Sequence, residues 1–218
     1  PAGKIWDKET LARIGKLAFD NGVIVVSDEI HCDLTMPGSM YVPFASVSEE
    51  CRMNSISLMA PTKTFNLAGL QTSCVAVPNK RIHHKVWRAL NTDEVAEPNS
   101  FALVAAITAF TQGENWLDAL RSYISANRDY VIDRLQKEVP EIKVVSEDAT
   151  YLLWIDIKNV SNDSEKFAAD LRSKTGLWIT EGVHYGASGE GFIRMNIACP
   201  RTTLVDGVNR LITGVKSL

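Results

Sequence analysis

The sequence predicts an α/β protein, and two observations support this fold class. Short runs of apolar and β-branched residues occur at 23–26 (VIVV), 55–59 and 73–77, and such runs are typical of strands buried on both faces of a parallel sheet. Segments with apolar residues at helical spacing alternate with them. This alternation indicates a mainly parallel sheet flanked by helices, with ligands expected beyond the carboxyl ends of the strands.

The first expected domain comprises residues 1–113. Its first helix is predicted from Asp7, a plausible N-cap, to the Asn21-Gly22 pair, which is a typical helix stop. Two further helices are expected over 81–90 and 100–111. The strands listed above lie between these helices, and the third is expected to be of the same kind as the first two.

The second expected domain, residues 114–218, reads as a small α+β domain. It opens with one long helix from Glu114 to Val139, which carries a single apolar stripe and is closed by Pro140. Strands are expected at 151–157 (YLLWIDI), 177–180 (LWIT) and 192–197 (FIRMNI). Helices are expected over 164–175 and from 202.

Composition excludes several classes of function. With 45% hydrophobic residues, a net charge of -3 and scattered cations, the chain of 218 residues offers no basic field for nucleic acid or an anionic membrane. No apolar run reaches the roughly 20 residues that span a bilayer, and the N-terminus does not read as a leader. The four cysteines are widely spaced, so we expect neither a metal site nor a disulfide framework. A soluble cytoplasmic protein with a small-molecule or protein partner is expected.

Two side chains could carry chemistry at the edge of the sheet. Asp28 follows the first apolar run, and Lys63 follows the second by four residues. If both strands belong to one parallel sheet, the two side chains emerge at the same edge. A lysine in a partly apolar pocket can act as a nucleophile or base. Taken alone, Asp28 is better read as a cap or loop acid and Lys63 as a solvated surface lysine.

Three segments together resemble a known family. SDEIHCDL, APTKTFNLAGLQTS and GFIRMNIACPR occur in this order, and they resemble the fold-type I pyridoxal-phosphate (PLP) enzymes of aminotransferase class I/II, specifically the carbon–sulfur β-lyase branch. The resemblance implies part of a PLP-transferase-like large domain followed by a small α+β C-terminal domain. It covers essentially the whole chain, which corresponds to the C-terminal portion of the family's enzymes.

The resemblance also implies roles for individual residues. Lys63 would bond covalently to the cofactor and then remove the substrate Cα proton. Asp28 would face the pyridine nitrogen, which makes the ring a stronger electron sink. Thr62 would contact the phosphate. Arg194 would bind the substrate carboxylate in bidentate fashion, and Asn196, two positions along the same strand face, would assist. Taken alone, Arg194 is better read as a solvated edge residue.

The chain departs from the family pattern at three positions. His31 stands where many aminotransferases carry a tyrosine that contacts the phenolic oxygen of the cofactor; the lyase branch also has histidine there, although a lone histidine can equally be a core or loop residue. Ala60 and Gln71 replace a serine and an arginine often found on the phosphate side. The groups that the family carries upstream, including a phosphate-binding helix start and an aromatic residue stacked on the ring, do not occur in this sequence.

The expected function is cleavage of cystathionine or a related cysteine thioether to thiol, pyruvate and ammonia. An aminotransferase is the alternative within the same fold, and a non-catalytic fragment or interaction module is the alternative from a different class. The family implies an amino-acid substrate and a homodimer. Loss of neighbouring strands would leave apolar edges exposed and favour association.

Overall fold

The computed structural model describes residues 2–217, and the chain divides into two compact units. The N-terminal unit contains Ile5–Thr35 and Met40–Ala119. The C-terminal unit contains Met36–Ser39 and the chain from Leu120, together with residues 2–4. The domain assignment of residues 1–113 and 114–218 stays a prediction.

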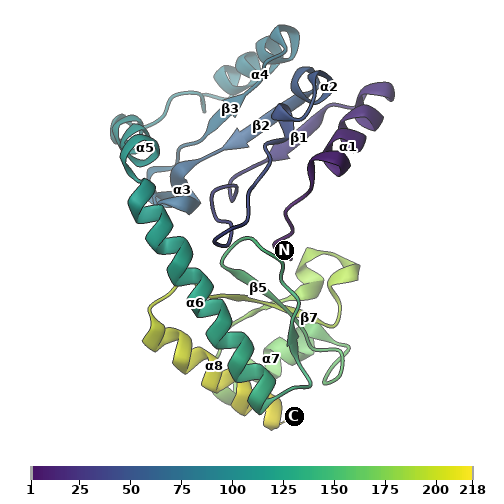
Figure 1. Cartoon of the computed structure of the whole chain (residues 1–218), viewed down its shortest axis with the longest axis vertical. Coiled ribbons are helices and arrows are strands. Elements are labelled where there is room, and N and C mark those ends of the chain that lie inside the picture. Colours follow the sequence, from purple (N-terminus) through teal and green to yellow (C-terminus); the bar gives the residue numbers. More distant parts are fainter. Residues whose placement is uncertain (1, 218) are drawn as a thin grey trace. The chain divides into compact units, whose positions relative to one another are not determined.

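The sheet of the N-terminal unit consists of β1 (Val25–Asp28), β2 (Ser55–Met59) and β3 (Cys74–Ala76), in that order (Figure 1). β1 pairs with β2 in parallel, whereas β3 pairs with β2 antiparallel. The α/β class is thus confirmed, but the sheet is mixed, and the expectation that the third strand resembles the first two is wrong. Only two short helical turns connect β2 to β3, whereas a parallel return usually needs a crossover helix.

β1 lies two residues later in the chain than expected. The predicted run at 23–26 begins with Val23 and Ile24, which are exposed and precede the strand. The strand starts at Val25 because its partner β2 starts at Ser55. The N–H of Val25 donates to Asn54 O at 3.0 Å. β1 is also not buried on both faces, since Val26 is 60% exposed. Pairing, rather than apolarity, sets the bounds of this strand.

Five α-helices accompany this sheet. The predicted helices of the first region are confirmed within a few residues, and each is capped by a side chain: Asp7 accepts a hydrogen bond from Thr10 N–H at 2.7 Å, and Asn79 and Asn99 cap two later helices in the same way. The helices are α1 (Lys8–Asp20), α2 (Glu49–Met53), α3 (Pro61–Thr64), α4 (Lys80–Thr92) and α5 (Ser100–Gln112).

Burial is uneven in this unit. A small core forms around Leu11, Phe44 and Cys51, and α1 reaches it at Gly15, where a Cβ atom would collide with Cys51 Sγ. α5, by contrast, exposes large apolar side chains, with Phe101 79% exposed. An all-round apolar helix is typical of the interior of a larger core, so α5 presents an unusually large apolar surface.

The C-terminal unit contains an antiparallel sheet in the order β4-β5-β7-β6. The long helix was predicted correctly, and α7 matches its predicted range. The expected strand at 177–180 is mostly wrong, since only Thr180 pairs, and β4 was not predicted. The elements are α6 (Glu114–Glu138), which begins in the N-terminal unit, β4 (Lys143–Val144), β5 (Leu152–Asp156), α7 (Ser164–Thr175), β6 (Thr180–Glu181), β7 (Phe192–Asn196) and α8 (Arg201–Lys216).

Strand β7 separates core residues from polar ones by strict alternation. Ile193 and Met195 are buried, whereas Arg194 is half-buried and Asn196 is exposed. Alternate residues of a strand point to opposite faces. Arg194 and Asn196 therefore share the face away from the core.

Within residues 2–217, the structure contains no helix whose length and apolarity would allow it to cross a membrane.

Introducing alanine at Gly15 tests the contact between α1 and α2. Alanine favours a helix by about 1 kcal/mol over glycine, but overpacking against Cys51 costs about 1–3 kcal/mol, so Gly15→Ala should lower the free energy of unfolding, measured in urea by circular dichroism. In the Cys51→Ala background the collision is absent, and the same substitution should be neutral or stabilising. Equal effects in both backgrounds would contradict the contact.

Candidate functional site

The first candidate group lies at the carboxyl end of the β1–β2 pair. Asp28 is the last residue of β1 and pairs in register with Leu58 of β2. α3 follows β2 after Ala60 and carries Lys63. The register therefore brings both strand ends to one edge of the sheet, and the side chains of Asp28 and Lys63 are both exposed there.

Lys63 lies on the short helical turn α3. Pro61 occupies the first turn of α3, where its missing N–H costs nothing, and its carbonyl accepts a hydrogen bond from Phe65 N–H at 2.9 Å. Thr64 is fully buried and donates to Asp33 Oδ2 at 3.0 Å. These contacts fix the turn, so that Lys63 projects to solvent next to the half-buried Thr62.

Glu29 is a buried carboxylate at the same edge that the sequence reasoning missed. It is only 3% exposed, and its Oε1 accepts hydrogen bonds from Ser27 Oγ at 2.9 Å and Phe44 N–H at 3.2 Å. Its own N–H donates to Leu58 O at 2.8 Å, which extends the β1–β2 ladder by one bond. The signal in the sequence was a second acid directly after Asp28, which reads like a surface residue.

Burial around Glu29 suppresses ionisation of two neighbours. Burial raises the pKa of the Cys32 thiol to about 12, and the nearby carboxylates of Asp33 and Glu29 add to this increase. Burial also raises the pKa of the Tyr41 phenol, with Glu29 as the next cause. Both groups therefore stay neutral near pH 7 and serve as uncharged packing and hydrogen-bonding groups.

His31 lies in the turn that leaves β1. Its carbonyl accepts from Leu34 N–H at 3.0 Å, and Cys32 N–H donates to Glu29 O at the same distance. The ring is half-buried. The structure thus brings four of the predicted residues, Asp28, His31, Thr62 and Lys63, into one unit and onto the segments that leave the ends of two adjacent strands.

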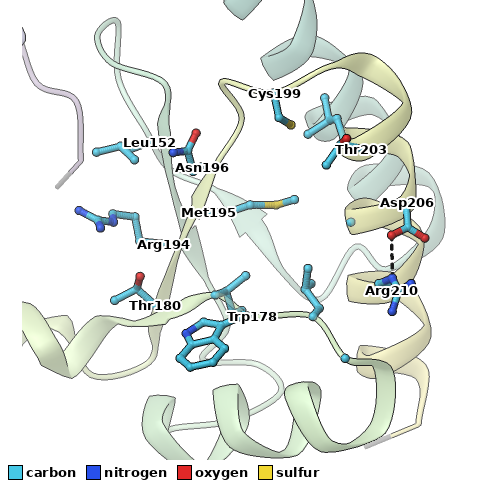
Figure 2. Close-up of a pocket in the computed structure, with 15 residues that line it drawn as sticks. Leu152, Trp178, Thr180, Arg194, Met195, Asn196, Cys199, Thr203, Asp206 and Arg210 are labelled. Carbon is cyan, nitrogen blue, oxygen red and sulfur yellow. Dashed lines mark hydrogen bonds and ion pairs between the residues drawn. The ribbon is translucent and has the colours of Figure 1, made fainter. Parts of the chain in front are cut away.

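Arg194 and Asn196 form the second candidate group, which belongs to the C-terminal unit. In the register of the sheet, Arg194 lies between Trp154 of β5 and Thr180 of β6. Figure 2 shows Arg194 and Met195 leaving β7 on opposite sides, as the alternation requires. Among residues 2–217 no carboxylate forms an ion pair with Arg194, so its charge is available to a ligand.

A cavity of about 460 Å³ opens beside this strand. β6 pairs with β7 only through Thr180 and Glu181, whereas β7 continues to Asn196. The cavity lies between the unpaired segment before β6, strand β7 and helix α8. The ion pair between Asp206 and Arg210 lies on the α8 side of the cavity (Figure 2). Arg194 and Asn196 contribute to its lining, so the predicted carboxylate-binding residues lie at an open space.

The described part of the chain, residues 2–217, contains no group of three or more His, Cys, Asp or Glu residues that could hold a metal ion. The side chains of the first candidate group supply an amine, a carboxylate, an imidazole and a hydroxyl, and those of the second supply a guanidinium and an amide. The two candidate groups belong to different units. Their assignment as one site stays a prediction.

Comparison with known proteins gives consistent matches over nearly the whole chain. Residues 1–211 match the model of the aminotransferase class I and II family. The chain is 37% identical over 211 residues to cystathionine beta-lyase PatB of Bacillus subtilis, covering 97% of this chain and 54% of PatB, and 32% identical over 219 residues to protein MalY of Escherichia coli, covering 100% of this chain and 55% of MalY.

Among solved structures, cystalysin from Treponema denticola, which contains a pyridoxal 5'-phosphate cofactor, matches with a TM-score of 0.95 and 29% identity. The match covers 100% of this chain and 55% of that one. The chain therefore spans about half the length of the curated relatives and of the solved structure that it matches.

The raised pKa of Cys32 predicts slow alkylation. Near pH 8.5 an ordinary thiol is about half ionised, whereas only on the order of one Cys32 in a thousand is a thiolate. Iodoacetamide labelling followed by peptide mass spectrometry should modify the exposed Cys74 first, and the rate at Cys32 should still rise with pH through about pH 10. Labelling of Cys32 as fast as Cys74 at pH 8.5 would show that the thiol is not shielded.

Proposed function

Because the chain belongs to the aminotransferase class I and II family, we propose that it forms part of a pyridoxal-phosphate-dependent carbon–sulfur β-lyase. The observation that carries this proposal is the parallel register of β1 and β2, which brings Asp28 and the Lys63 turn to one edge of the sheet. The matches to cystathionine beta-lyase PatB and to cystalysin support a lyase specifically. The activity is proposed for a protein that includes this chain, since its relatives are about twice as long.

The residues fit pyridoxal phosphate at two of its functional groups. The exposed Lys63 amine suits the cofactor aldehyde, and the exposed Asp28 carboxylate suits a protonated pyridine nitrogen. The phosphate side is poorer: Thr62 offers a hydroxyl, but Thr64 donates to Asp33, Ala60 has no polar group and Gln71 has no charge. When bound, the cofactor would act as the electron sink for the substrate carbanion.

The remaining steps belong to the chain's own side chains. Arg194 would bind the substrate carboxylate through paired N–H donors, with Asn196 assisting on the same strand face. Lys63 would remove the Cα proton. The thiolate would then leave from Cβ, and the released aminoacrylate would be hydrolysed to pyruvate and ammonia. His31 would contact the phenolic oxygen of the cofactor.

The surrounding assembly is part of the same proposal. We propose a cytoplasmic homodimer that takes an amino-acid substrate. The exposed apolar surface of α5, where Phe101 and Val104 are 79% and 68% exposed, supports association with another apolar surface. A class I/II aminotransferase is the alternative, because the family's description names that activity.

Titration with pyridoxal phosphate tests the role of Lys63. The wild-type chain should develop an absorbance band near the visible edge of the ultraviolet, which Lys63→Ala should lose because the amine is gone. Lys85→Ala, which removes another exposed lysine of the same unit, should keep the band. A band that survives Lys63→Ala, or its absence in the wild type, would count against cofactor binding by this chain and favour a non-catalytic module.

The reaction class is tested by pyruvate release from L-cystathionine. A lyase should form pyruvate without any added keto acid, and Lys63→Ala should reduce the rate by at least about a hundredfold, as expected for loss of a general base. A strict requirement for a keto-acid acceptor would identify the aminotransferase alternative. Cofactor binding without either reaction would indicate that the chain alone is not catalytic.

A further inference from the structure

The aromatic ring of Tyr185 lies against the guanidinium of Arg194. The Arg194 Cζ atom is 4.7 Å from the centroid of the Tyr185 ring, within the range of a cation–π interaction. A ring face attracts a cation but accepts no conventional hydrogen bond, so this contact leaves the N–H donors of Arg194 free. An acidic partner would instead compete with a ligand for those donors.

Tyr185 is itself held by other aromatic rings. Its ring meets that of Trp154 edge-on, with centroids 5.8 Å apart and an interplanar angle of 76°. Trp154 is 7% exposed and stacks on Phe192 at 5.3 Å and 18°. Both geometries are favoured for aromatic pairs. The orientation of the Tyr185 ring is therefore fixed by contacts with β5 and β7 rather than by its own turn alone.

The turn that carries Tyr185 is anchored directly to the backbone of β7. Tyr185 ends a 3-10 turn, Gly182–Tyr185, that follows β6. Gly182 and Gly189 are packed backbone to backbone: a Cβ at Gly182 would collide with the carbonyl oxygen atoms of Gly189 and Phe192. Only glycine permits this approach. The two glycines therefore set the position of the turn relative to the strand that carries Arg194.

We propose that Tyr185 is a positioning residue that holds Arg194 ready for the carboxylate of an amino-acid ligand. The inference rests on the proposed function, in which Arg194 binds that carboxylate. The ring would restrict the rotamers of a long side chain that has no acidic partner among residues 2–217. Pre-ordering of this kind improves affinity by reducing the entropy lost on binding.

The test compares Tyr185→Leu, which removes the ring, with Tyr185→Phe, which keeps it. The Nε–Hε NMR signal of Arg194, assigned by its loss in Arg194→Lys, reports both the ring's magnetic shielding and ligand binding, with L-cystathionine as the probe. Tyr185→Leu should abolish the shielding and weaken the probe's apparent affinity by about two- to fivefold, the size expected for a partly exposed cation–π contact. Tyr185→Phe should stay within about twofold of the wild type.

Tyr130→Leu is the matched control. It removes a similar contact elsewhere in the C-terminal unit, where the Arg201 guanidinium carbon is 4.9 Å from the Tyr130 ring centroid, and it should leave the probe's affinity unchanged. Wild-type affinity in Tyr185→Leu, or equal losses in Tyr185→Phe and Tyr185→Leu, would overturn the positioning role and leave the function intact. A wild-type Arg194 signal that does not respond to the probe would overturn carboxylate binding itself.

Discussion

The parallel pairing of β1 with β2 is the constraint on which the first candidate group depends. Four residue pairs, from Val25↔Ser55 to Asp28↔Leu58, hold the strands in register, and Glu29 N–H adds a bond to Leu58 O at 2.8 Å. Because parallel strands end at the same edge, this ladder brings to one edge of the sheet two segments whose residues Asp28 and Lys63 are 35 positions apart in sequence. Nothing local in either segment produces that proximity.

Buried polar groups around the ladder support an edge whose chemical groups, Asp28 and Lys63, are exposed. Burying a carboxylate such as Glu29 is costly unless its oxygens are hydrogen-bonded, and Ser27 Oγ and Phe44 N–H supply those bonds. The Thr64–Asp33 bond does the same for the Lys63 turn. These hydrogen bonds satisfy the buried polar atoms next to the site, while Asp28 and Lys63 themselves are exposed.

Sequence reasoning succeeded where the determinants are local and failed where they depend on a partner strand. Helices were located well because their caps, such as Asp7, Asn79 and Asn99, are encoded next to the helix itself. The bounds of β1, the antiparallel direction of β3 and the short β6 depend on which backbone lies alongside. The candidate site shows the same dependence on partners. Lys63 and Arg194 lie in recognisable sequence motifs. Tyr185 looks in sequence like an ordinary aromatic residue of a glycine-rich turn, and only its contact with Arg194 in the structure singles it out.

The alternation of β7 links the core of the C-terminal unit to its surface chemistry. Ile193 and Met195 are buried while Arg194 and Asn196 are not, and a strand that slipped by one residue would exchange these two sets. The buried side chains of Ile193 and Met195 thus fix which residues of the strand face away from the core. A substitution that loosens the packing of Ile193 or Met195 would therefore also disturb the placement of the Arg194 guanidinium.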